Sequence, residues 1–211
     1  MKEILWLNCS ARGAASLSFQ AGQKMIASLT RQSPGAHVNR RDLATDAIPF
    51  IDAAYTAHMY LDETAARDEP SLQVSEALIK ELMRADILVV STPMHNFTVP
   101  APLKAWIDQV LRINRTFVRT PRGKEGLLTD KPSYILVSAG GGVLGEDAGQ
   151  PDFLTPYLHA VLKTIGLTDV SFFYLEKMAG GAPPPQEVFD ALQLEISERL
   201  SGQAELATAR P

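Results

Sequence analysis

The sequence predicts an α/β fold: a doubly wound, five-stranded parallel sheet with helices on both faces. Four short apolar runs are mostly unbroken rather than alternating, which is typical of strands buried on both faces of a parallel sheet. These runs lie at residues 4–7, 87–90, 134–137 and 170–175. Helical stretches separate them, and this alternation favours parallel strands joined by right-handed crossovers. A weaker candidate at residues 37–43 supplies a fifth, more exposed strand.

Helices are expected where apolar residues recur at helical spacing. The helix after the 87–90 strand has an apolar stripe at Leu103, Trp106, Ile107, Val110 and Leu111. In the last helix an apolar residue recurs every four positions, at Val188, Leu192, Ile196 and Leu200. The expected helices cover residues 18–32, 69–84, 103–111, 152–165 and 185–200.

Three segments depart from this alternation. Residues 46–68 predict a short helical insertion, and residues 116–128 predict a loop or hairpin. Both are consistent with surface decoration and equally with lining a site or a subunit contact. Residues 201–211 lack apolar periodicity, so we expect a frayed tail. The whole chain, residues 1–211, is expected to form one domain.

Composition limits the classes of function. The 211 residues are 45% hydrophobic and 21% charged, with a formal net charge of −4. This mildly acidic balance gives no electrostatic support for binding nucleic acid or a membrane surface. The single cysteine, Cys9, excludes an internal disulfide and fits a reducing compartment. The N-terminus lacks the apolar core of a signal peptide, and no apolar run has membrane-spanning length, so we expect a cytoplasmic protein.

The loop after the first strand is rich in hydroxyl groups. Ser10, Ser16 and Ser18 surround Gly13, and the next helix opens immediately. Backbone N–H groups and the positive end of the helix dipole then favour a phosphate group. In the alternative interpretation, Ser16 caps the helix and the other serines are incidental. The loop is not a Walker motif, and it lacks the phosphatase spacing because Ala15 stands where arginine is required.

The loop that follows residues 87–90 is the most informative segment of the chain. It holds three prolines, an asparagine and large apolar side chains. It lies at the carboxyl edge of the predicted sheet, where open α/β folds bind ligands. Proline stiffens the loop, so its N–H groups can be held against a planar heterocycle. The alternative is an ordinary apolar strand–helix connection, and His95 is equally a ligand-edge residue or a solvent-facing bystander.

A glycine-rich loop follows residues 134–137. Gly140, Gly142 and Gly145 form a literal G-x-G-x-x-G, but a dinucleotide motif follows the first strand and opens a helix. Here residues 146–151 are loop, so we reject that interpretation. A glycine run after a buried strand does let a flat ring press against the main chain. A side chain at Gly141 would then occupy the volume of the ring and demand a forbidden φ.

The spacing of the other polar residues argues against several further chemistries. The histidines have no metal-ligand spacing, so we expect no metal site. No G-x-S-x-G elbow occurs, and nothing indicates a serine or cysteine triad. Cys9 is either a thiol activated beside a helix N-terminus or a small apolar residue at the end of a strand.

Four blocks of the sequence resemble the FMN-dependent NADH azoreductase/quinone oxidoreductases, a branch of the flavodoxin-like flavoproteins. Residues 10–18 are similar to the family's serine-rich phosphate loop, and residues 93–104 to its flavin-ring loop. The third block combines residues 116–117 and 125–127 with Ser138 and the glycines after it. The fourth combines residues 155–158 and 165–170. Together the blocks span most of the chain in the order that the family shows.

The resemblance implies a flavodoxin-like fold and a homodimer with FMN at the subunit interface. It implies ping-pong chemistry: NADH or NADPH gives a hydride to flavin N5 and leaves, and a quinone or azo acceptor enters the same pocket. A quinone takes one cycle and an azo bond takes two. No side chain is assigned as a catalytic acid or base. The implied cofactor-binding residues are Ser10, Ser16, Leu17, Ser18, Met94, His95, Asn96, Phe97, Ser138, Ala139, Gly140 and Gly141.

Three positions depart from the family pattern. His95 stands where the family usually has tyrosine or another aromatic residue, Ala139 where it commonly has arginine, and Arg119 near an expected substrate-stacking tyrosine. FMN binding survives the first two changes if backbone N–H groups do most of the ring recognition. We expect altered redox potential or substrate preference instead. The alternatives from other functional classes are a flavodoxin-type one-electron carrier and a non-catalytic flavin-binding regulator.

Overall fold

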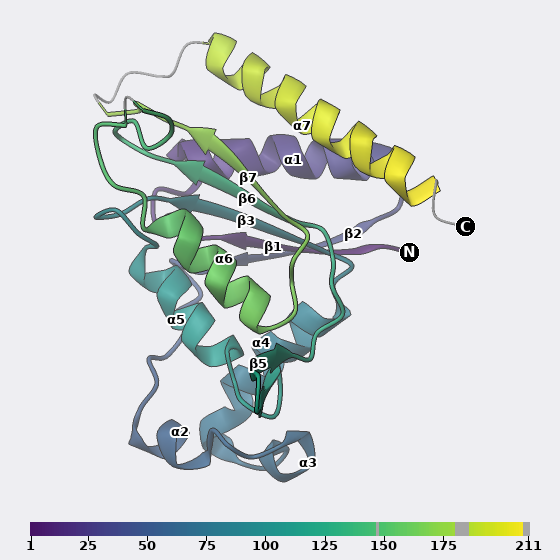
Figure 1. Cartoon of the computed structure of the whole chain (residues 1–211), viewed down its shortest axis with the longest axis vertical. Coiled ribbons are helices and arrows are strands. Elements are labelled where there is room, and N and C mark those ends of the chain that lie inside the picture. The colour runs from purple at the N-terminus through teal and green to yellow at the C-terminus, as the bar shows by residue number, and fades with distance from the viewer. Residues whose placement is uncertain (147, 180–185, 209–211) are drawn as a thin grey trace.

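Five parallel strands form the main sheet of the computed structural model, which describes residues 1–146, 148–179 and 186–208. The strand order is β2-β1-β3-β6-β7, so the chain winds outward in both directions from β1 (Figure 1). Without the separate β4–β5 hairpin this is the 2-1-3-4-5 order of flavodoxin-like folds, which confirms the predicted fold class. The strands are β1 (Glu3–Asn8), β2 (His37–Asp42), β3 (Ile87–Pro93), β6 (Ser133–Ser138) and β7 (Val170–Leu175).

Helices cover both faces of the sheet (Figure 1). One face carries α1 (Leu17–Gln32) and α7 (Gln186–Thr208). The other face carries α4 (Gln73–Arg84), α5 (Ala101–Val110) and α6 (Leu154–Thr164).

The apolar strands supply the cores on both faces. Successive side chains of a strand point to opposite faces of the sheet. On β1, Ile4 and Trp6 therefore belong to the core beneath α1 and α7. Leu5 and Leu7 belong to the core beneath α4, α5 and α6. Burial on both faces explains why these strands have unbroken apolar sequences.

Two segments that depart from the strand–helix alternation, which we call the first and second excursions, take the forms that the sequence predicts. Residues 46–68 contain the short helices α2 (Ala53–His58) and α3 (Glu63–Ala66). Residues 116–128 contain an antiparallel hairpin of β4 (Phe117–Thr120) and β5 (Gly123–Gly126). In Figure 1 both lie at the bottom of the view, beside the ends of α4 and α5.

A buried ion cluster ties the second excursion to α4. The Arg112 side chain is fully buried and donates to the Glu76 carboxylate and, at 3.0 Å, to the Ser75 hydroxyl. Arg115 donates two hydrogen bonds to the same carboxylate, each at 2.9 Å. Burial alone would raise the pKa of Glu76, but the hydrogen bonds from Arg115 and Arg112 outweigh it and hold the pKa below its ordinary value. Glu76 is therefore a carboxylate that anchors the chain leading into β4.

The five predicted helices are all present, but each has an end that differs by at least one residue from the predicted one. A 3₁₀ turn, Pro70–Leu72, precedes α4, which starts at Gln73 rather than at residue 69. α5 starts at Ala101 because Pro102 fits the first turn of a helix, where its missing N–H is not needed. α7 continues to Thr208, whereas the sequence predicts a frayed tail from residue 201. Residues 204–207 are strong helix formers, which offsets the lost periodicity, and residues 209–211 lie outside the described part of the chain.

Candidate functional site

Three loops meet at the carboxyl edge of the sheet, towards which the strand arrows point in Figure 1. We call them the serine loop (residues 9–16), the proline loop (residues 94–100) and the glycine loop (residues 139–146). The loops follow strands β1, β3 and β6, which are neighbours in the sheet. The Cys9 N–H donates to the Ser91 carbonyl at 2.9 Å, and the Met94 N–H donates to the Ser138 carbonyl at 2.8 Å. The three sets of predicted cofactor residues are therefore brought together.

The serine loop places buried hydroxyl groups at the start of α1. Gly13 has a φ of +53°, a left-handed conformation that glycine adopts easily. Ser10, Ser16 and Ser18 are all buried, and the last two hydroxyl oxygens lie 3.0 Å apart. Ser16 is the N-cap residue of α1, as the capping interpretation has it, but its side chain makes no capping hydrogen bond; the first turn of α1, which begins at Leu17, holds no acidic residue. Uncapped N–H groups, buried hydroxyls and the helix dipole together suit a phosphate.

A glycine in α1 lets the helix lie close to the sheet. A Cβ at Gly22 would overlap the Ser91 hydroxyl and lie 2.9 Å from the Trp6 indole nitrogen. That indole N–H donates to the same hydroxyl at 2.8 Å, beneath the helix. The close approach fixes the start of α1 at the edge where the three loops meet.

The proline loop begins with a tight reversal. The His95 N–H donates to the Thr98 carbonyl at 2.9 Å, and the Thr98 N–H donates back at 3.1 Å. Between them, Asn96 and Phe97 have φ values of +49° and +72°, the signature of a type I′ turn. Positive φ is rare for phenylalanine, and backbone strain of this kind is concentrated at binding sites. His95, Asn96 and Phe97 are all exposed at the tip, which leaves both interpretations of His95 open.

Hydrogen bonds to the backbone fix the glycine loop. The Ala139 N–H donates to the Leu175 carbonyl at 2.9 Å and extends the pairing of β6 with β7. The Glu176 carboxylate accepts hydrogen bonds from the N–H groups of Val143 and Leu144, the latter at 2.8 Å. α6 starts only at Leu154, so the G-x-G-x-x-G motif opens no helix and its rejection as a dinucleotide motif is confirmed.

The structure corrects one of the two expectations for Gly141. Its φ does not lie in the left-handed region, so the expectation of a forbidden φ is wrong. A Cβ at this position would instead lie 2.9 Å from Oε1 of the Gln150 side chain. At Gly149, in the same connection, a Cβ would have nothing within 4 Å.

Sequence reasoning missed Gln150 and Glu176. Glu176 directly follows β7, so its place at the carboxyl edge could have been inferred from the strand order. Gln150 carries no local signal, because it faces Gly141 and Met94 through the tertiary fold. Both residues contact the loops that carry the predicted cofactor-binding residues.

Neither a reactive thiol nor a metal centre lies at this edge within the described residues. Cys9 is buried, and burial raises the pKa of its thiol far above the ordinary value, against a smaller opposing effect of a hydrogen bond with Thr92. Cys9 is therefore a small apolar residue at the end of β1. No three histidine, cysteine, aspartate or glutamate side chains gather to hold a metal in the described part of the chain. No helix described there is long and apolar enough to cross a bilayer.

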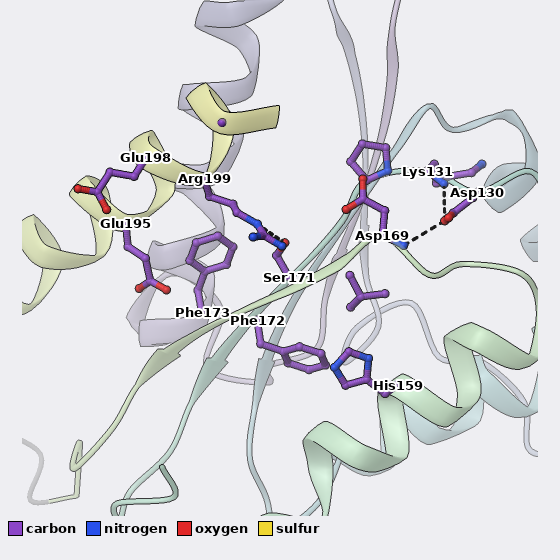
Figure 2. Close-up of a pocket in the computed structure, with 13 residues that line it drawn as sticks. Asp130, Lys131, His159, Asp169, Ser171, Phe172, Phe173, Glu195, Glu198 and Arg199 are labelled. Carbon is purple, nitrogen blue, oxygen red and sulfur yellow. Dashed lines mark hydrogen bonds between the residues drawn. The ribbon is translucent and has the colours of Figure 1, made fainter. Parts of the chain in front are cut away.

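A large cavity lies elsewhere, at the amino ends of β6 and β7 (Figure 2). It has a volume of about 1230 Å³ and lies between residues of α6 and α7, including His159 and Arg199. Two of its charged groups are engaged in the fold: Lys131 donates to the Leu82 carbonyl at 2.8 Å, and Asp130 accepts from the Thr168 N–H at 2.8 Å. None of the predicted cofactor residues lines this cavity.

Comparison with known proteins identifies the family. Residues 2–200 match the model of a family described as having a flavodoxin-like fold. FMN-dependent NADH:quinone oxidoreductase 4 of Pseudomonas fluorescens is 45% identical over 197 residues, which are 93% of this chain and 95% of that protein. FMN-dependent NADH:quinone oxidoreductase 5 of Burkholderia lata is 44% identical, over 94% of each chain.

Solved structures show the same fold. The azoreductase from Bacillus anthracis str. Sterne aligns with a TM-score of 0.79 at 24% identity, over 94% of this chain and 98% of that one. An FMN-dependent NADH-azoreductase from Bacillus anthracis str. Ames Ancestor, solved in complex with FMN, aligns with a TM-score of 0.80 at 22% identity, over 97% of this chain and all of that one. The chain belongs to the flavodoxin-like family, among the FMN-dependent NADH:quinone oxidoreductases.

Proposed function

We propose that this chain binds FMN at the carboxyl edge of its sheet and is an NADH:quinone oxidoreductase that also reduces azo compounds. The observation that carries the proposal is the meeting of the serine, proline and glycine loops beside β1, β3 and β6. The relatives named as FMN-dependent NADH:quinone oxidoreductases support it, because they match almost the whole chain at 44–45% identity.

The serine loop fits the phosphate of FMN. Ser10, Ser16 and Ser18 offer buried hydroxyl groups, and the N–H groups that start with Leu17 open α1 without a side-chain cap. A phosphate there meets donors and the positive end of a 16-residue helix, with no carboxylate in the first turn. These donors support a site for one terminal phosphate.

The proline and glycine loops fit the isoalloxazine ring. Residues 94–97 would lie against one part of it with their stiff, strained backbone, and the backbone of residues 138–141 would lie against another, beside the Gln150 amide. Bound FMN would supply the redox chemistry, taking a hydride from NADH or NADPH and passing two electrons to a quinone, or four to an azo bond over two cycles. The protein's residues bind and orient; we assign none of them as an acid or base.

We also propose that donor and acceptor occupy this pocket in turn, and that a second copy of the chain completes it. Large apolar side chains stand exposed on or next to the loops of the candidate site, with Phe97 44%, Leu144 49% and Phe153 59% exposed. The Phe153 N–H donates to the Phe97 carbonyl at 3.1 Å, so two of these residues are joined. Exposed apolar groups clustered around a binding site favour association with another subunit.

The identity of the cofactor tests the proposal. The purified protein should be yellow, and chromatography of the heat-released flavin should show FMN, because the loops offer a site for one phosphate and no adenine-binding half. Release of FAD, or failure to bind any flavin after reconstitution, would contradict the proposed site.

A further inference from the structure

The Gln150 side chain lies where the proline and glycine loops meet. Its Nε2 is 3.5 Å from the Met94 sulfur, and its Oε1 lies 2.9 Å from the place that a Cβ on Gly141 would take. Met94 and Gly141 belong to the two loops proposed to hold the flavin ring. The amide is therefore next to both parts of the proposed ring site.

The neighbouring backbone holds this side chain in place. The Gly149 N–H donates to the Gly142 carbonyl at 3.0 Å, which anchors the chain just before Gln150. Just after it, the Asp152 carboxylate accepts hydrogen bonds from the N–H groups of Leu154 and Thr155, both at 2.9 Å, and so fixes the start of α6. Gln150 is half-buried between these two anchors.

The hydrogen-bonding capacity of this amide is largely unused within the described residues. A glutamine amide has two N–H donors and a carbonyl acceptor, whereas a thioether sulfur is a weak acceptor. The contact with Met94 is the hydrogen bond that the described structure gives the Gln150 side chain. A half-buried amide with so weak a partner is suited to bind a ligand that presents both acceptors and donors.

We infer that Gln150 is a cofactor-facing residue whose amide hydrogen-bonds the polar pyrimidine edge of the isoalloxazine ring, an inference that rests on the proposed function. That edge presents two carbonyl acceptors and one N–H donor, the complement of an amide. Reduction of the flavin adds electron density to this part of the ring. An amide N–H directed at it therefore stabilises the reduced form more than the oxidised form.

Two substitutions of Gln150 test the inference in the FMN-loaded, full-length protein. Gln150→Leu removes the donor and should raise the FMN dissociation constant by about three- to tenfold, the loss of one neutral hydrogen bond. Gln150→Glu keeps the shape but places a carboxylate against the ring edge, so the midpoint potential of bound FMN should fall below that of the parent and of Gln150→Leu. Flavin fluorescence quenching measures the affinity, and equilibrium reduction against a reference dye measures the potential.

Two control variants separate direct contact from other effects. Gly149→Glu adds the same charge one residue away, where a side chain has free space, and should shift the potential much less than Gln150→Glu. Gln186→Leu removes an exposed amide that bonds Asp190 in α7, and should change neither quantity. Circular dichroism checks that each variant is folded.

The outcomes distinguish the inference from the function on which it rests. If the parent binds FMN but Gln150→Glu and Gln150→Leu both keep its midpoint potential, Gln150 only packs the loop and the inference is wrong. An equal shift in Gly149→Glu and Gln150→Glu also overturns it, because the effect would then be a general one of charge. A parent that binds no FMN overturns the proposed function itself.

Discussion

At the scale of single residues, the site depends on which positions have no side chain and which side chains fill the remaining space. Gly13 has a left-handed backbone that favours glycine, whereas a Cβ at Gly141 would displace the end of the Gln150 side chain. Glu176 holds the backbone beyond Gly141 by accepting two N–H groups. Backbone geometry and the side chains that pack beside it therefore shape the candidate site together.

Gly141→Val tests this view. The new side chain would collide with Gln150 and press it or the turn into the ring site, so we expect FMN affinity to fall about 10- to 100-fold, in keeping with the 1–3 kcal/mol cost of overpacking. The fold should survive, because the turn lies at the edge of the sheet. Gly149→Val is the matched control and should bind FMN nearly as well as the parent, since its Cβ meets nothing within 4 Å. Equal affinities for Gly141→Val and the parent would remove the glycine loop from the site.

At the scale of elements, local patterns predicted most of the architecture. Four of the five strands were visible as apolar runs, the fifth was a weaker and more exposed candidate, and the helices between them were visible as helical stripes. The alternation predicted a doubly wound parallel sheet, and the structure adds the order of its strands. Helix ends were less predictable: local 3₁₀ geometry moved the start of α4, and helix propensity carried α7 to Thr208. The buried Glu76–Arg112–Arg115 cluster could not be predicted from the sequence, because Glu76 is 36 residues from Arg112 and 39 from Arg115. Nothing in the local sequence marks these charged residues as buried.

Glu76→Gln tests the role of that cluster. The change leaves Arg112 and Arg115 buried without their carboxylate, so the free energy of unfolding should fall by about 3–5 kcal/mol, measured by urea denaturation. Glu63→Gln is the control: Glu63 is exposed and lies 3.6 Å from Arg115, and its loss should change stability by less than about 1 kcal/mol. Equal effects of the two changes would show that the buried cluster does not anchor the excursion.

The same cluster predicts a pH dependence. Because the folded protein holds the pKa of Glu76 below its ordinary value, the stability it contributes is present above the ordinary carboxyl pKa and is lost as the pH falls through the lowered one. Between neutral pH and that acid range, the stability of the parent should fall more steeply than that of Glu76→Gln. Parallel pH profiles for the two proteins would contradict this account.

At the scale of the whole molecule, parallel strands bring distant loops to one edge, which is why the candidate site could be predicted from sequence. Residues 10–18, 94–97 and 138–141 each follow a strand, and a parallel sheet places the ends of its strands together. Gln150 could not be predicted, because its position depends on how the connection to α6 folds back over Gly141. Residues that follow parallel strands can thus be grouped into a candidate site from the sequence, whereas a residue such as Gln150 is brought to it by tertiary packing.

The exposed apolar edge predicts a dimer. With FMN bound, light scattering should give twice the chain mass of 23.0 kDa, because a second subunit would cover Phe97, Leu144 and Phe153. Phe153→Asp should weaken the association, whereas Leu194→Asp, on an exposed part of α7, should not. A monomer mass for the fully FMN-loaded parent would contradict the shared site.

The central claim is that the three loops hold FMN for reduction by a nicotinamide cofactor, and an anaerobic titration tests it most directly. NADH added to the FMN-loaded protein should bleach the oxidised flavin absorbance at about one equivalent per site, since hydride transfer moves two electrons. A quinone added next should restore the absorbance. A protein whose bound flavin stays oxidised after excess NADH and NADPH would be an electron carrier or a flavin-binding regulator, and the proposed enzyme activity would be wrong.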